Sequence, residues 1–409
     1  MNILTLALAA IRAHKLQSAL CIAALACGIA LLVTVSLLFV NIESGLKRNA
    51  EGVDVIVGAK GSPLQLVLSS IYHADIPNGN INVHEMEELQ KNPQVKKAIP
   101  LAIGDNYKGF RIVGTSPEYV DLYKGEIAEG KNFSALYEAV AGSQSSIPLG
   151  TKFAALHGFS ADSDDVHDAH LYTVVGRLKP TGTVLDKLIL TSYQSVQDLH
   201  GRHEDHDHEE GHHDEDEEDE EALGHQITAL LIKTKTPVGV MNLPREINQH
   251  SDVMAASPSH VMARTMSSLG LGRNVLVIVG GAFFALSMLM LFSILTSGLS
   301  QRRYDLAVLR VLGGGRSFLF GTVLAEGLIL SAIGAIAGAV MGHVFAFLIA
   351  SYVVPAMQSV VLPDALLAPS LSDVALIGAG ILCGGLASLV PAITASRADI
   401  AGLLAQGRA

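Results

Sequence analysis

Four long apolar stretches restrict the fold of this chain more than any other feature of its sequence. They cover residues 16–40, 273–299, 318–352 and 374–393, and none has a Lys or Arg in its interior. A helix rises about 1.5 Å per residue, so roughly 20 apolar residues cross a hydrocarbon layer of about 30 Å. Four buried helices of a soluble protein are the alternative, which the length of the stretches disfavours. We therefore expect four transmembrane α-helices.

Basic residues indicate the orientation of these helices. Lys and Arg occur in the short segments 1–15, 300–317 and 394–409, whereas the short loop 353–373 has none. Short cytoplasmic loops of membrane proteins carry an excess of Lys and Arg. This rule places both termini and the 300–317 loop in the cytoplasm, and residues 41–272 on the other side. The segment 1–15 is an amphipathic helix at the inner surface or an N-terminal extension of the first span.

The segment 41–272 mixes strand and helix patterns, which predicts an α+β extracytoplasmic domain inserted between the first and second spans. Strands are expected at 53–57, 110–114, 171–175, 184–190 and 227–233, and helices at 83–92 and 192–200. Polar residues 41–51 are expected to continue the first span as a helix. The three cysteines, Cys21, Cys27 and Cys383, all lie in the apolar stretches. The domain must therefore fold without a disulfide.

Residues 200–225 differ in composition from the rest of this domain. They hold seven histidines, and thirteen carboxylates lie between Glu204 and Glu221 without any Lys or Arg. Such a segment repels itself and buries no apolar surface, which predicts a disordered loop. Imidazole and carboxylate groups are ligands of Zn²⁺ and related ions. The candidate metal ligands are His203, His206, His208, His212 and His213. A solvated loop that binds metal only incidentally is an equally good interpretation.

Several kinds of chemistry lack support in the sequence. No G-x-x-x-x-G-K-[ST] loop is present to hold nucleotide phosphates, and neither G-x-S-x-G nor C-x-x-C occurs. Basic residues do not cluster with aromatic ones, so nucleic-acid binding is not indicated. Gly313, Gly314 and Gly315 lack a following Lys and indicate a turn. The sequence thus gives no reason to expect a catalytic residue.

Two features of the third apolar stretch indicate contacts between helices. Gly334, Gly338 and Gly342 are four residues apart and share one helix face, where small residues allow close approach of a second helix. That helix belongs either to the same chain or to a second copy. Glu326 and His343 are ionisable residues in the same stretch, and we expect them to form interhelical hydrogen bonds rather than an ion pathway.

Two motifs carry a resemblance to a known family. Residues 301–313 read QRRYDLAVLRVLG and resemble the cytoplasmic loop of FtsX/MacB-type permeases, Q-R-x-x-E-I-x-[IV]-x-[KR]-A-x-G, with Asp305 in place of Glu and Val311 in place of Ala. Residues 391–400 resemble the family ending P-A-x-x-A-[AS]-[KR]-x-x-P, with Ile400 in place of Pro. The order of one span, a large outer domain and three further spans matches this family over nearly the whole chain. The segment 57–81 resembles one branch of it, often with a His-rich loop.

This resemblance implies a permease subunit of an ABC transporter in the bacterial inner membrane. Such a subunit is not an enzyme, binds no cofactor directly and uses ATP through a separate cytoplasmic ATPase. It works as a homodimer or paired permease, with a periplasmic protein or lipoprotein as a further partner. By analogy, the loop would couple to the ATPase through Arg302, Arg303, Tyr304, Asp305, Leu306, Leu309, Arg310 and Leu312.

The resemblance further implies that ATP hydrolysis moves the outer domain, in order to export, extract or regulate an envelope substrate. The histidines favour a process linked to Zn²⁺ or another divalent metal. Two alternatives from other classes stay open. One is a stand-alone divalent-metal carrier that uses its His-rich loop, and the other is a non-transporting adaptor that regulates a cell-wall hydrolase.

Overall fold

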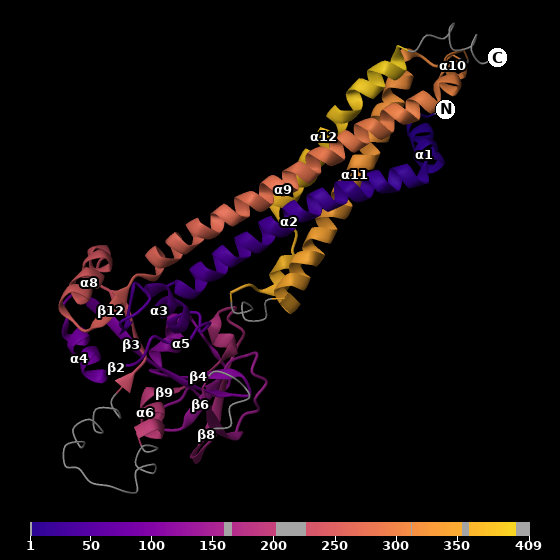
Figure 1. Ribbon diagram of the computed structural model, residues 1–409. Coiled ribbons are helices and arrows are strands. Elements are labelled where there is room, and N and C mark those ends of the chain that lie inside the picture. The colour runs from indigo at the N-terminus through magenta and orange to yellow at the C-terminus, as the bar shows by residue number, and fades with distance from the viewer. Residues whose placement is uncertain (1, 159–165, 202–225, 312, 354–359, 398–409) are drawn as a thin grey trace, which may run out of the picture. The chain divides into compact units, whose positions relative to one another are not determined.

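The computed structural model describes residues 2–158, 166–201, 226–311, 313–353 and 360–397. The chain forms two compact units (Figure 1). We call the first the helical unit; it comprises Met1–Asn41, Leu269–Pro355 and Pro363–Ala409. We call the second the sheet domain; it comprises Ile42–Ser268 together with Ala356–Leu362.

Four helices are long and apolar enough to cross a membrane. They are α2 (Lys15–Ala50), α9 (Pro258–Gln301), α11 (Arg316–Leu348) and α12 (Leu371–Ser396). A π-helical turn at Ile349–Val353 extends α11, and a 3-10 turn at Pro363–Leu367 precedes α12. The four expected spans lie within these helices. The 36 residues of α2 correspond to about 54 Å, so this helix is much longer than a hydrocarbon layer. It continues through Ala50, as the polar residues after the first span predict.

Two short helices complete the helical unit, α1 (Ile3–Ala13) and α10 (Arg303–Val311). His14 lies between α1 and α2 with non-helical backbone angles, so α1 is not an extension of the first span. The side chain of Ile3 packs against α11 at Gly321. A Cβ atom at Gly321 would lie only 3.0 Å from the Cδ1 atom of Ile3. The helix predicted for the N-terminal segment is therefore present and is anchored by an apolar contact.

A ten-stranded mixed sheet forms the centre of the sheet domain, with the order β12-β1-β11-β3-β4-β9-β6-β8-β5 and with β7 pairing to β3 and β8. Most pairs are antiparallel, whereas β4–β9 and β6–β8 are parallel. A separate pair is made by β2 (Ile81–Asn82) and β10 (Gln226–Ile227). The strands of the main sheet are β1 (Val55–Ala59), β3 (Val95–Tyr107), β4 (Phe110–Thr115), β5 (Ile127–Gly130), β6 (Glu138–Ala141), β7 (Lys152–His157), β8 (Val166–Leu178), β9 (Leu188–Ser192), β11 (Ala229–Thr234) and β12 (Val253–Ala256).

Helices pack on this sheet and bury two apolar clusters. The helices are α3 (Pro63–Ser70), α4 (Val83–Lys91), α5 (Glu118–Leu122), α6 (Tyr193–Gly201) and α8 (Pro237–His250). One cluster includes Val57, Leu230 and Leu243, and the other includes Phe153 and Tyr172. Side chains cap several helices, since Ser62, Asn82 and Thr236 accept hydrogen bonds from the first backbone N–H groups of α3, α4 and α8. The domain thus has sufficient apolar packing without a disulfide, and all three cysteines are free.

The mixed α+β class agrees with the sequence prediction, and two local predictions are wrong. Residues expected as one strand at 184–190 form a 3-10 turn, Val184–Lys187, followed by β9. The carboxylate of Asp186 accepts hydrogen bonds from the backbone N–H groups of Thr181 and Gly182, which favours the turn. The first strand was expected to end before Gly58, but β1 continues to Ala59 because both of its edges are paired, with β11 and β12.

Candidate functional site

The segment predicted to couple to an ATPase is helical in the structure. It follows the end of α9 at Gln301, forms α10 and leads into α11 at Arg316. The predicted coupling residues Arg303, Tyr304, Asp305, Leu306, Leu309 and Arg310 lie on α10, Arg302 immediately precedes it, and Leu312 lies outside the described residues. Gly313 has a φ of +98°, a left-handed conformation that glycine adopts without strain, and Gly315 caps α11. The turn predicted from the three glycines is confirmed.

Arg302 connects the start of α10 to the next long helix. Its guanidinium Nη2 lies 3.4 Å from Oε1 of Glu326, which is buried on α11. His343 makes a similar connection, since its Nε2 lies 3.0 Å from Oδ2 of Asp373 on α12 and its Nδ1 contacts the backbone oxygen of Leu366. Both ionisable residues of the third stretch therefore hold neighbouring helices together, as predicted.

Basic residues gather at one end of the helical unit. Figure 1 shows α1, α10 and the C-terminal end of α12 at that end. Its described basic residues are Arg12, Lys15, Arg302, Arg303, Arg310, Arg316 and Arg397. At the opposite end, the described part of the unit has one basic residue, Arg273, whose guanidinium lies 4.6 Å from the ring centre of Phe39. The two ends of the unit are thus strongly unequal in charge.

The three glycines predicted to pack against another helix lie close to α2. A Cβ atom at Gly334 would lie 2.7 Å from Cβ of Leu25, and one at Gly342 would lie 2.7 Å from Cβ of Val33. At Gly338 the obstacle is backbone, because a Cβ atom there would lie 2.7 Å from the carbonyl oxygen of Ala26. In addition, the Thr34 hydroxyl donates a hydrogen bond to the Gly342 carbonyl oxygen at 3.1 Å. These glycines allow α11 to approach α2 of the same chain.

The predicted metal ligands His203, His206, His208, His212 and His213 all lie outside the described residues. The same segment contains an H-E-x-x-H pattern at 208–212, which binds zinc where it lies on a helix. This pattern also lies outside the described residues. The structure therefore tests none of these positions.

The sheet domain contains a different group of metal-ligating side chains, Asp105, His157 and His200, whose ligand atoms all lie within 4.8 Å of one another. Oδ1 of Asp105 lies 3.2 Å from Nε2 of His200 and 3.6 Å from Nδ1 of His157. The Asp105 side chain is 1% exposed, against 35% for His200 and 52% for His157. We call these three residues the Asp–His cluster.

Three elements bring the Asp–His cluster together. Asp105 lies on β3 and pairs with His157 at the end of β7. The register of β3 against β4 shifts at Gly104, a bulge of the kind that re-aims side chains. His200 lies in the last turn of α6, and its Nε2 would be 3.7 Å from a Cβ atom at Gly104. The His200 imidazole therefore lies beside the backbone bulge of β3 that carries Asp105.

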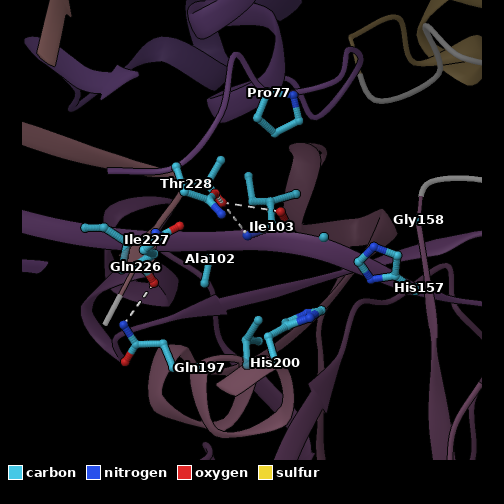
Figure 2. A pocket seen from close by; sticks show the side chains of 13 residues that line it. Pro77, Ala102, Ile103, His157, Gly158, Gln197, His200, Gln226, Ile227 and Thr228 are labelled. Carbon is cyan, nitrogen blue, oxygen red and sulfur yellow. Dashed lines mark hydrogen bonds between the residues drawn. The ribbon is translucent and has the colours of Figure 1, made fainter. Parts of the chain in front are cut away.

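A cavity of about 350 Å³ adjoins the cluster, and His157 and His200 are both part of its wall. Figure 2 shows these two imidazoles near each other at one end, with Thr228 and Ile103 toward the other. The floor is fixed by hydrogen bonds, since the Thr228 hydroxyl accepts from the backbone N–H of Ile103 at 2.8 Å and the Gln197 amide donates to the backbone oxygen of Gln226 at 2.9 Å. Solvent can thus reach the cluster through a preformed space.

Sequence reasoning missed the Asp–His cluster. His200 was counted only as the first of seven histidines in a charged segment, and Asp105 and His157 had no local signal. Burial raises the pKa of the Tyr172 hydroxyl, and the negative charge of Asp105 raises it further. Only the pairing of β3 with β7 and the packing of α6 reveal the cluster.

Two family models match the chain, and they cover both its sheet domain and its C-terminal helices. The model of a MacB-like periplasmic core domain matches residues 18–249, and that of the FtsX-like permease C-terminal domain matches residues 277–400. No curated protein sequence matches the chain. The solved periplasmic region of MacB from Actinobacillus actinomycetemcomitans is 10% identical, with a TM-score of 0.33, over 55% of this chain and 97% of that chain. The extracellular domain of the noncanonic ABC-type transporter YknZ from Gram-positive bacteria is 11% identical, with a TM-score of 0.31, over 50% and 99%.

Four apolar helices and one mixed sheet domain define a multi-pass membrane protein of the bacterial inner-membrane type. Because the MacB-like match alone covers more than half of the residues, the chain belongs to the FtsX/MacB-type permease family. It is accordingly a permease subunit of an ABC transporter. The resemblance inferred from residues 301–313 and 391–400 is confirmed.

Proposed function

We propose that this permease couples ATP hydrolysis by a separate cytoplasmic ABC ATPase to movement of its sheet domain outside the membrane. Membership of a family whose permeases work with such ATPases supports this partner. The absence of a G-x-x-x-x-G-K-[ST] sequence also supports it, because the chain then has no phosphate-binding loop of that kind. In this proposal the chain is a non-catalytic subunit that transmits motion and works as a homodimer or paired permease.

The observation that carries the proposal is the basic end of the helical unit, where α10 lies. Short segments rich in Lys and Arg stay in the cytoplasm. The rule orients this end, with α1 and α10, toward the cytoplasm, and it orients the sheet domain outward. An ATPase in the cytoplasm would then meet α10 directly. Movement of the sheet domain would then export, extract or regulate a substrate in the cell envelope.

The connections of α10 explain how a push on it would reach the membrane helices. Arg302 is bonded to the buried Glu326 of α11, and Ala307 in α10 is itself buried. A displacement of α10 would therefore shift α9 and α11 together, rather than bend a free loop. Rigid-body shifts of packed helices are a common way to transmit a signal between distant sites. The coupling residues act, in this proposal, as the ATPase-contacting part of the unit.

Co-purification tests the proposal. Tagged protein is extracted gently from native membranes, and its partners are identified by mass spectrometry. The ATPase activity of the purified complex is measured as well. We expect an ABC ATPase to co-purify in stoichiometric amount. Its binding should be lost when the order of residues 303–311 is shuffled, and it should be weakened by Arg310→Glu. The matched control is Arg273→Glu, which reverses a charge of the same type at the opposite end of the unit and should keep the partner.

Two outcomes would contradict the proposal. If the shuffled protein still binds the ATPase, α10 is not the coupling element. Absence of any ATPase from the wild-type preparation under several detergents would favour a stand-alone divalent-metal carrier or an adaptor of a cell-wall hydrolase. Uptake of ⁶⁵Zn by whole cells and capture of a hydrolase would then separate these two alternatives.

A further inference from the structure

We propose that the sheet domain binds one divalent first-row transition metal ion, such as Zn²⁺, through Asp105, His157 and His200. Two imidazoles and one carboxylate are a ligand set of intermediate softness that Zn²⁺ and its neighbours prefer. This site differs from the five histidines predicted as ligands from the sequence. It also requires no ATPase, so it can stand or fall independently of the proposed function.

The distances within the cluster suit coordination by one ion. Ligand atoms 2.0–2.1 Å from a tetrahedral Zn²⁺ are about 3.3 Å from one another. The Asp105 oxygen lies 3.2 Å from the His200 nitrogen and 3.6 Å from the His157 nitrogen, which brackets this value. The histidine nitrogens lie within 4.8 Å of each other, and a rotation of the half-exposed His157 ring would bring its nitrogen toward the ion.

The surroundings favour a charged ligand set at this position. A carboxylate in the protein interior is stabilised by hydrogen bonds, by a nearby positive charge or by a metal ion, because its transfer from water is costly. An ion with two positive charges would add such stabilisation to Asp105, while the two imidazoles supply neutral ligands. The adjoining cavity would admit the ion and would leave a coordination position open to water or to a further ligand.

Strand pairing and helix packing hold the three ligands in place. Asp105 and His157 are fixed by pairing of β3 with β7. His200 is fixed by α6, whose Leu199 is buried and whose Ser195 bonds to Ser192 at the start of the helix. A preformed site loses less conformational entropy on binding than the histidines of a charged, self-repelling segment would lose. We therefore expect the cluster to be the tightest metal site of the chain.

The test uses the full chain in lipid nanodiscs, with residues 203–221 deleted to remove the other histidines. Zn²⁺ affinity is measured by competition with a chromogenic chelator, and Co²⁺ is used as a spectroscopic probe of coordination. We expect one Zn²⁺ per chain and Co²⁺ absorption bands typical of four-coordinate nitrogen and oxygen ligands. His157→Gln and His200→Gln should each lower affinity about tenfold or more. His250→Gln alters an exposed histidine on α8 and should change nothing.

Three results would overturn the site. The first is loss of all tight binding when 203–221 is deleted, which would assign the metal to that segment. The second is wild-type affinity and an unchanged Co²⁺ spectrum in His157→Gln, a variant at a half-exposed position. The third is equal affinity loss in His250→Gln, which would indicate binding to surface histidines in general. In each case the cluster is a hydrogen-bonded group of the domain interior.

Discussion

The helical unit and the sheet domain are packed on different physical principles. In the helical unit, close contacts are made by small residues, as where Gly338 lies against the backbone of Ala26. In the sheet domain, large aliphatic and aromatic side chains such as Leu230 and Tyr172 fill the interior. Lipid tails are as apolar as leucine, so burial of leucine gives membrane helices little advantage and close backbone approach becomes important. In water, burial of apolar area is itself the main driving force.

This comparison predicts opposite sensitivities to side-chain size. Enlarging a side chain should damage the helical unit most, and shortening one should damage the sheet domain most. Three measurements test this contrast.

Shortening Leu230 should have the largest effect. Leu230 is fully buried on β11, between Val57 of β1 and Pro100 of β3. Leu230→Ala should lower the free energy of unfolding by about 2–5 kcal/mol, because apolar contacts are lost and a cavity remains. Denaturant unfolding of the full chain in detergent micelles measures this change. The control is Leu136→Ala at a 53% exposed position, where a change within about 0.5 kcal/mol is expected. Equal costs in the two variants would contradict the contrast.

Enlarging Gly338 should have the next largest effect. A Cβ atom there would lie 2.7 Å from the Ala26 carbonyl oxygen and 2.9 Å from Cβ of Ile29, so Gly338→Leu forces α11 away from α2. Overpacking of this kind costs about 1–3 kcal/mol. The thermal unfolding midpoint in micelles should fall accordingly. Gly378→Leu on α12 is the matched control, because a Cβ atom at that position meets nothing within 4 Å. If both variants unfold at the same temperature, the glycine face does not hold these helices together.

Acid should destabilise the sheet domain through His73. Its Nε2 lies 2.9 Å from the Tyr119 hydroxyl, and burial lowers the pKa of the imidazole to about 3, helped by the positive charge of Arg111. The unfolded chain, with a histidine pKa near 6.5, then binds more protons, so stability is full above pH 6.5 and declines as the pH falls toward 3. Between pH 7.5 and 5.5 we expect a loss of about 1 kcal/mol.

Unfolding of the full chain at several pH values tests this third prediction. His73 has a φ of +48°, and Asn tolerates this region of the backbone, so His73→Asn should fold and should flatten the pH dependence in this range. His84→Asn removes an exposed histidine on α4 and should leave the pH dependence unchanged. A wild-type slope in His73→Asn would assign the acid sensitivity to other groups.

The sequence predicted the helical unit better than the sheet domain, for physical reasons. An apolar run of more than 20 residues has few alternatives to a membrane helix, and a spacing of four residues places glycines on one helix face. The strand β3 was missed because Pro100, Gly104 and two lysines interrupt its pattern. Proline is rare within central strands, yet the Pro100 carbonyl still accepts a hydrogen bond from the Thr115 hydroxyl. The Asp–His cluster was missed because it depends on that strand.

The pairing of β1 has a consequence for how the domain acquires its fold during export. Its neighbours on both edges, β11 and β12, come from the end of the domain, as in the pairs Val55 with Ile232 and Ile56 with Ala256. The 177 residues from Val55 to Ile232 (232 − 55) take roughly 10–35 s to synthesise at about 5–20 residues per second. During this interval β1 is an unpaired apolar strand, open to association with other chains. The last strands to cross the membrane therefore complete the structure that the first strand begins.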